Sequence, residues 1–177
     1  MELHGLYLFQ HGLTGEISWE IGTKLSNLEY LLLSGNELNG TIPKSLGNCS
    51  QLLELELAKN FLMGGIPQEF GKLCLLQKLT LHDNHLYSEE SISIFGALSN
   101  FTNLQTLDFS IPDLKGDLPG TICRLSQNLL HLYLYENRFT GKIPEEMSNL
   151  TRLILLSLAG NFLSGEVPSA IEGLSSL

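Results

Sequence analysis

The stretch Asn36-Glu37-Leu38-Asn39-Gly40-Thr41-Ile42-Pro43 recurs along this chain, and its recurrence decides the fold. Related copies begin at Asn60, Asn137 and Asn161, the last with Val167 in place of isoleucine. A Leu-x-x-Leu-x-Leu run precedes each copy, and the steps from Leu28 to Leu52 and from Leu129 to Leu153 are 24 residues. A fixed period of this length predicts a solenoid, because each unit is too small to bury its own apolar face and must stack on its neighbours.

About seven units account for nearly the whole chain, and we expect them to form a single domain over 1–177. Their ranges are 3–27, 28–51, 52–75, 76–103, 104–128, 129–152 and 153–177. In each unit the x-Leu-x-Leu-x segment predicts a short parallel strand, with its leucines in the core and the intervening residues facing outward. The chain starts and stops inside a unit, so we expect a fragment that lacks both caps and self-associates through exposed leucines.

An asparagine ends most of the predicted strands. A buried amide needs hydrogen-bond partners, so these asparagines are expected to bind backbone groups of adjacent coils as a structural ladder. The ladder residues are Asn36, Asn60, Asn84, Asn137 and Asn161. Pro112 occupies the ladder position of the fifth unit, where the ladder should break. The preceding unit is longer, and Ile92, Phe95 and Leu98 have helical spacing, which predicts a short amphipathic helix near 89–98.

The leucines together with the Gly-x-Ile-Pro tail resemble the plant-type leucine-rich repeat found in the ectodomains of receptor-like kinases. This resemblance implies an α/β repeat solenoid, a right-handed superhelix with a parallel concave sheet and short convex strands or 3-10 turns. It also implies a non-catalytic, cofactor-free segment that binds a peptide, a saccharide or a protein, with a co-receptor ectodomain as a second partner. The parent would be an extracellular, single-pass plasma membrane protein, with any kinase domain outside this chain. A secreted inhibitor of cell-wall-degrading enzymes, similar to polygalacturonase inhibitors, is the alternative.

The charge balance narrows the class of partner. Ten Lys and Arg stand against 19 Asp and Glu, which gives a formal charge of −9. Nucleic acid is excluded as a partner, because phosphate binding needs clustered basic residues, whereas a basic ligand suits this balance. No apolar run approaches the roughly 18 residues of a membrane span, so we expect no membrane contact by this segment.

An acidic and aromatic stripe on the outward positions of successive strands is the candidate ligand site. Tyrosine offers a large contact area with a polar tip, and carboxylates orient Lys or Arg on a ligand. The candidates are Glu54, Glu56, His82, Asp83, Asp108, His131, Tyr133, Tyr135 and Glu136. The competing interpretation is a solvated sheet face that binds nothing.

Other motifs suggest modification rather than catalysis. Four Asn-x-Ser/Thr sequons predict N-glycosylation of a secreted protein, at Asn39, Asn48, Asn100 and Asn149. His82 and His85 flank a ladder position, and the repeat explains them better than a metal site does. Three cysteines lie in three different units, and Cys49 takes a leucine position, which favours a small core residue.

Overall fold

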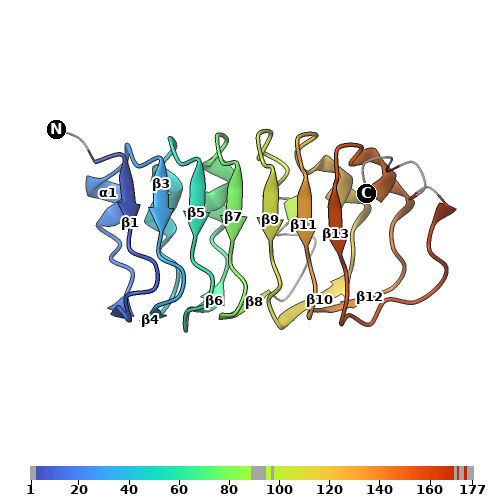
Figure 1. The fold of residues 1–177 in the computed structure, drawn as a ribbon, viewed down its shortest axis with the longest axis horizontal. Coiled ribbons are helices and arrows are strands. Elements are labelled where there is room, and N and C mark those ends of the chain that lie inside the picture. Colours follow the sequence, from blue (N-terminus) through green and yellow to red (C-terminus); the bar gives the residue numbers. More distant parts are fainter. Residues whose placement is uncertain (1–2, 89–94, 97, 170, 172–173, 175–177) are drawn as a thin grey trace.

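The computed structural model describes residues 3–88, 95–96, 98–169, 171 and 174. Each unit forms one coil, and the coils stack side by side along the long axis of the molecule (Figure 1). Seven parallel strands face the viewer in Figure 1 in the order of the chain. They are β1 (Gly5–Tyr7), β3 (Tyr30–Leu32), β5 (Glu54–Glu56), β7 (Lys78–Thr80), β9 (Thr106–Asp108), β11 (His131–Tyr133) and β13 (Leu155–Ser157). The predicted repeat solenoid with its long parallel sheet is therefore confirmed.

A second row of short strands follows the asparagines and runs along the lower edge in Figure 1. β6 (Met63–Gly65), β8 (His85–Ser88), β10 (Asp113–Asp117) and β12 (Arg138–Thr140) form a four-stranded sheet. β2 (Thr14–Glu16) and β4 (Glu37–Asn39) form a pair, and an isolated bridge between Thr41 and Met63 joins the two groups. Each coil therefore has two extended sides.

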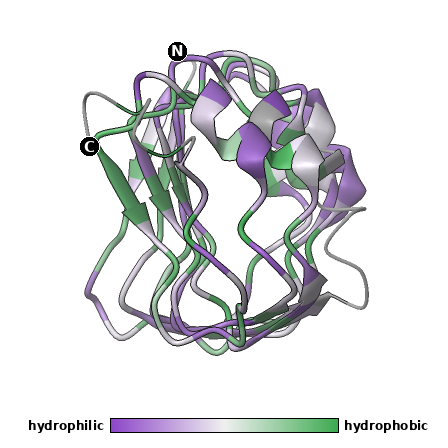
Figure 2. Cartoon of the chain, turned by 90° about the vertical axis from the view of Figure 1, so that its right-hand side faces the viewer, coloured by the Kyte–Doolittle hydropathy of each residue, from purple (hydrophilic) through white to green (hydrophobic). Residues whose placement is uncertain are grey.

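Short helical turns close the coils on the side opposite the long sheet (Figure 2). Four 3-10 turns, η1 (Lys44–Asn48), η2 (Gln68–Lys72), η3 (Gly120–Arg124) and η4 (Glu145–Asn149), each begin directly after a proline. Proline suits this boundary because its fixed φ ends the extended Ile-Pro step and it lacks an N–H to donate. The first unit has an α-helix instead, α1 (Ile21–Lys24), which the sequence did not predict. The helix predicted near 89–98 lies mostly outside the described residues, although Phe95, Gly96 and Leu98 have helical backbone.

One continuous apolar core fills the inside of the stack. The central leucines of the strands, such as Leu31, Leu55 and Leu79, are 0% exposed. Five phenylalanines add bulk between the leucine rows, at Phe70, Phe95, Phe101, Phe109 and Phe139. Every fully buried side chain of this size contributes about 1.5–3 kcal/mol, so the core fixes the relative position of neighbouring strands.

The ladder asparagines connect neighbouring coils through backbone groups. The Asn84 side chain accepts the N–H of Leu62 at 3.0 Å and donates to the carbonyls of Leu57 and Leu81 at 2.9 and 3.1 Å. In the fifth unit Pro112 is exposed, and the Asp108 carboxylate binds the local backbone instead, with Oδ1 accepting the N–H of Ser110 at 3.1 Å.

Candidate ligand-binding face

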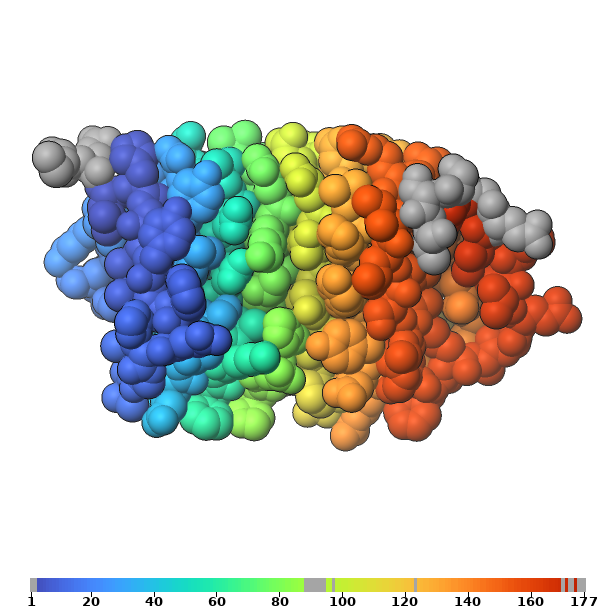
Figure 3. Space-filling view, viewed as in Figure 1, coloured from blue at the N-terminus to red at the C-terminus, as the bar shows by residue number. Residues whose placement is uncertain are grey.

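The outer side of the seven-stranded sheet, here called the sheet face, carries the residues that alternate with the core leucines (Figure 3). Strand register places Glu54 beside Lys78, and Asp108 beside Tyr133. Because adjacent strands lie about 4.8 Å apart, side chains in one row are within contact range of each other. The nine residues of the predicted stripe lie on this face or just beyond its strands.

Backbone pairing continues past the ends of the strands and forms a rim. Leu57 N–H donates to Thr80 O at 3.0 Å, and Lys59 N–H donates to His82 O at 2.8 Å. The rim residues directly before the asparagine positions have left-handed backbone, with φ of 56° at Lys59, 54° at Asp83 and 52° at Glu136. The sequence contained a signal for this, because the equivalent positions 35 and 160 are glycine, the residue that tolerates positive φ best.

Two of the predicted carboxylates are already engaged within the face. Glu56 forms an ion pair with Lys78. Asp108 Oδ2 lies 2.9 Å from His82 Nδ1, and the two side chains are only 11% and 22% exposed. The hydrogen bond to Asp108 raises the pKa of His82 above its usual value, against a smaller opposing effect of burial. The Asp108 carboxylate is therefore engaged by groups of the protein itself and is poorly placed to bind a basic group of a ligand.

The remaining acidic candidates have carboxylates that no basic side chain of the described residues neutralises. Glu54, Asp83 and Glu136 take part in none of the ion pairs found within the described part of the chain, and Asp83 and Glu136 are exposed on the rim. A basic group on a ligand would meet these three carboxylates first.

Aromatic rings gather on the C-terminal part of the face. The His131 and Tyr133 rings stack with centroids 6.4 Å apart, and Tyr135 meets Tyr133 edge-on at 6.5 Å. Burial raises the pKa of the Tyr135 hydroxyl, and the nearby Asp108 carboxylate adds to the shift. At the N-terminal end, Tyr7 and Tyr30 stack at 5.9 Å. Ring pairs of this kind offer flat apolar contact to a ligand.

A hollow of about 290 Å³ lies between the N-terminal aromatic rings and the centre of the face. Its lining includes Phe9, Gln10, Lys59, Lys78 and His82. The predicted stripe contains only two of the lining residues, His82 and Glu56, and omits both lysines. Sequence reasoning missed it because the hollow depends on small residues in neighbouring units, Ser34, Gly35 and Ala58, which line it as well.

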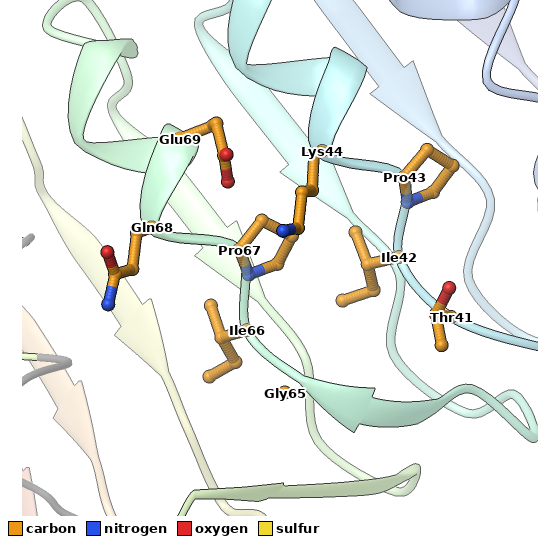
Figure 4. Close-up of a pocket in the computed structure, with 9 residues that line it drawn as sticks. All are labelled: Thr41, Ile42, Pro43, Lys44, Gly65, Ile66, Pro67, Gln68 and Glu69. Carbon is orange, nitrogen blue, oxygen red and sulfur yellow. The ribbon is translucent and has the colours of Figure 1, made fainter.

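Larger furrows of about 660 Å³ lie between consecutive Ile-Pro steps. Figure 4 shows one of them, between the steps at Ile42-Pro43 and Ile66-Pro67. An equivalent furrow separates Ile143 from Val167-Pro168 four units further along. Because the furrow recurs at the same repeat positions, we attribute it to the spacing of the coils rather than to a ligand.

All four sequon asparagines are exposed. Asn39 lies in β4, while Asn48 and Asn149 end the turns η1 and η4. None is on the sheet face, so glycans at these positions would leave that face open. The Asn100 amide already donates to Gly71 O at 3.1 Å, which makes it the most constrained of the four.

The two histidines that flank Asn84, His82 and His85, lie in different surroundings. His82 lies against Asp108, whereas the His85 ring stacks on Phe61 at 6.1 Å beside the second row of strands. Within the described ranges no three His, Cys, Asp or Glu side chains are grouped as metal ligands would be.

Cys49 is buried and burial raises the pKa of its thiol, whereas Cys74 is exposed. No described helix is long and apolar enough to cross a bilayer.

Comparison with protein families identifies leucine-rich repeats at residues 26–86, 128–150 and 152–174. A putative leucine-rich repeat receptor-like serine/threonine-protein kinase of Arabidopsis thaliana is 46% identical over 134 residues, which cover 73% of this chain and 14% of the relative. Receptor-like protein 41 of the same plant is 34% identical over 99% of this chain and 17% of its own length. The chain thus spans under a fifth of these curated relatives.

Two solved structures of plant proteins have the same fold. The crystal structure of PEPR1–AtPEP1 matches 99% of this chain with a TM-score of 0.88 and 34% identity, over 24% of its own chain. The Arabidopsis receptor kinase HAESA, in complex with the peptide hormone IDA and the co-receptor SERK1, matches 93% of this chain with a TM-score of 0.86 and 36% identity, over 27% of its own chain.

Proposed function

The chain belongs to the plant-type leucine-rich repeat proteins, and from this premise we propose that it is the ligand-recognition segment of a cell-surface receptor. Its sheet face binds a peptide, and the segment itself is non-catalytic. The observation that carries the proposal is the placement of stacked aromatic rings and unpaired carboxylates along one rigid, continuous sheet. A rigid scaffold with aromatic anchors limits the entropy that binding costs.

The relatives support a peptide over a saccharide. PEPR1 is solved as PEPR1–AtPEP1, and HAESA is solved with a peptide hormone. The dimensions also suit a peptide, because six strand spacings of about 4.8 Å span roughly 29 Å, which about nine extended residues cover.

The remaining proposals concern the longer parent. A co-receptor ectodomain joins the complex after the ligand binds, as the HAESA complex with SERK1 suggests for this family. The parent lies at the cell surface, and a serine/threonine kinase domain like that named in the first relative transmits the signal.

Selection from a library of peptides displayed on phage tests the binding role. Peptides of about 12 random residues are long enough to cross the sheet. Tyr133→Ser/Tyr135→Ala is the test variant, because Ser157 and Ala159 occupy the equivalent positions in the adjacent coil and the fold accepts them there. Phe61→Ser/Tyr87→Thr is the matched control, since it also removes two aromatic rings, but from positions in or next to the second row of strands.

Peptides enriched on the wild-type chain should bind it and the control equally, and bind the Tyr133/Tyr135 variant about 10- to 100-fold more weakly, as expected for loss of aromatic anchors. Peptides that bind all three proteins alike, or no enrichment at all, would refute the proposal that the sheet face is the binding site.

A further inference from the structure

The hollow on the sheet face originates in a run of small residues between larger ones. Backbone hydrogen bonds from Gln10 N to Ser34 O and from Gly35 N to Ala58 O, both 2.9 Å, hold the equivalent positions of the first three units next to one another. Gly35 lacks a side chain, and a Cβ added there would meet Gln10 Cγ at 2.9 Å. The floor is therefore open between Gln10 on one side and the next units on the other.

Hydrogen-bond donors surround this floor. Lys59, Lys78 and His82 are among the residues that line the hollow, and Ser34 lines it as well. The Ser34 Oγ is buried and has no hydrogen-bond partner among the residues that the structure describes. A buried hydroxyl without a partner is costly, and rotation of the Ser34 side chain toward the hollow would let this hydroxyl donate to a ligand.

The charges of the hollow do not cancel. Glu56, the acidic residue in the lining, forms an ion pair with Lys78. The His82 imidazole is paired with the Asp108 carboxylate, which is not part of the lining. Lys59 takes part in none of the ion pairs of the described residues and is exposed at the rim. The unpaired ammonium gives this part of an acidic protein a local preference for anions.

We propose that this hollow is a subsite for an acidic side chain of the peptide ligand, a proposal that rests on the function above. The carboxylate accepts a hydrogen bond from the exposed Lys59 ammonium, and one from the Ser34 hydroxyl once this side chain turns toward the hollow, while the apolar part of the Asp or Glu side chain lies against Phe9. The hollow, at about 290 Å³, is large enough to take one Asp or Glu side chain. The ligand is therefore amphoteric, with its basic group at Asp83 or Glu136, on the C-terminal side of Lys59.

The repeat itself provides variants that keep the backbone intact. Gln10 and Glu136 have the same left-handed conformation as Lys59, with φ of 58° and 52° against 56°. Lys59→Gln and Lys59→Glu thus place residues at position 59 that this fold already accepts. Lys115→Gln is the control, because Lys115 is exposed in β10, away from the sheet face.

The probe is the displayed peptide library, with each peptide joined to the phage coat through its C-terminus so that only side chains supply carboxylates. Binders of the wild-type chain and of Lys115→Gln should show Asp or Glu at one position about fivefold above the starting library, a ratio equivalent to the net contribution of one ordinary hydrogen bond. Lys59→Gln should abolish this preference, and Lys59→Glu should replace it with Lys or Arg.

Two results would overturn the subsite separately from the function. Wild-type binders without an acidic preference, or an acidic preference unchanged in both Lys59 variants, would refute the subsite and leave peptide binding intact. Failure of the wild-type chain to enrich any peptide over the Tyr133→Ser/Tyr135→Ala variant would overturn both.

Discussion

Asn60 allows the contribution of one ladder amide to be worked out bond by bond. It is 5% exposed, its Oδ1 accepts the N–H of Leu38 at 3.1 Å, and its Nδ2 donates to Leu33 O and Leu57 O at 3.0 Å each. Its Nδ2 also donates to Ala58 O at 3.2 Å, so Asn60→Ala removes the bonds of four backbone groups. If all four lost their only partner, the cost at about 1–3 kcal/mol each would reach several kcal/mol.

Three of these groups keep a partner. Ala58 O still accepts the N–H of Gly35 at 2.9 Å. Leu33 O also accepts from Asn36 Nδ2 at 2.8 Å, and Leu57 O also accepts from Asn84 Nδ2 at 2.9 Å. Only the Leu38 N–H loses its side-chain acceptor, so the free energy of unfolding should fall by about 1–3 kcal/mol, the cost of one stranded polar group.

Sharing of carbonyls predicts that ladder mutations are not additive. Asn60→Ala/Asn84→Ala removes both donors of Leu57 O, so the double variant should lose about 1–3 kcal/mol more than the sum of the single variants. Asn39→Ala is the control, because Asn39 is exposed and surface substitutions change stability by about 0.5 kcal/mol or less.

Urea unfolding followed by circular dichroism measures these differences, provided that the dependence of stability on urea is the same in all variants. An Asn60→Ala variant as stable as the wild type would show that the amide is not needed. Additivity within about 0.5 kcal/mol would refute the shared-carbonyl argument, since independent sites behave in that way.

Three other measurements test the packing and the charges. Gly22→Ala should lower the free energy of unfolding by about 1–3 kcal/mol, because its Cβ would lie 1.9 Å from a backbone oxygen of the next coil; unchanged stability would contradict the close approach. Iodoacetamide should modify exposed Cys74 well before buried Cys49, whose thiol pKa is raised, as site-resolved mass spectrometry would show; equal rates would contradict the burial. The pKa of His82 is raised in the folded state, so its pairing with Asp108 contributes stability that is complete below pH 6.5 and is lost as the pH rises through the folded pKa. The difference in free energy of unfolding between wild type and His82→Gln should therefore shrink from pH 6 to pH 8. A difference that stays constant over this range would refute the contribution of the pair.

The fold could be predicted from sequence because it depends on periodicity. Leucines such as Leu31 and Leu55 are buried at the spacing that their pattern requires, and each coil repeats its neighbour. Helix α1 could not be predicted, because the first unit has Ser18 where later units have proline, and no periodic signal distinguishes α from 3-10 turns over four residues.

The candidate site could be predicted only as a set of positions. Alternation identifies which residues face outward, but the pairing between them depends on contacts across neighbouring coils. Glu56 with Lys78 and His82 with Asp108 are each more than 20 residues apart in sequence, and their side chains could equally have pointed at solvent. The hollow was missed for a related reason, because it is defined by side chains that are absent, chiefly at Gly35.

Local pairing also changes which variants can test the partner's charge. A net charge of −9 suggests a basic ligand, and reversing the charge of Glu56 or Asp108 is the direct test from sequence. In the structure such a reversal would break an ion pair and free the charge of Lys78 or His82, so lost binding would have two explanations. Rim positions avoid this ambiguity, because Asp83 belongs to no ion pair of the described residues and Lys59 already occupies the equivalent left-handed position. Asp83→Lys should thus weaken binding of the basic part of a peptide without affecting its acidic side chain, and Lys59→Glu should do the reverse.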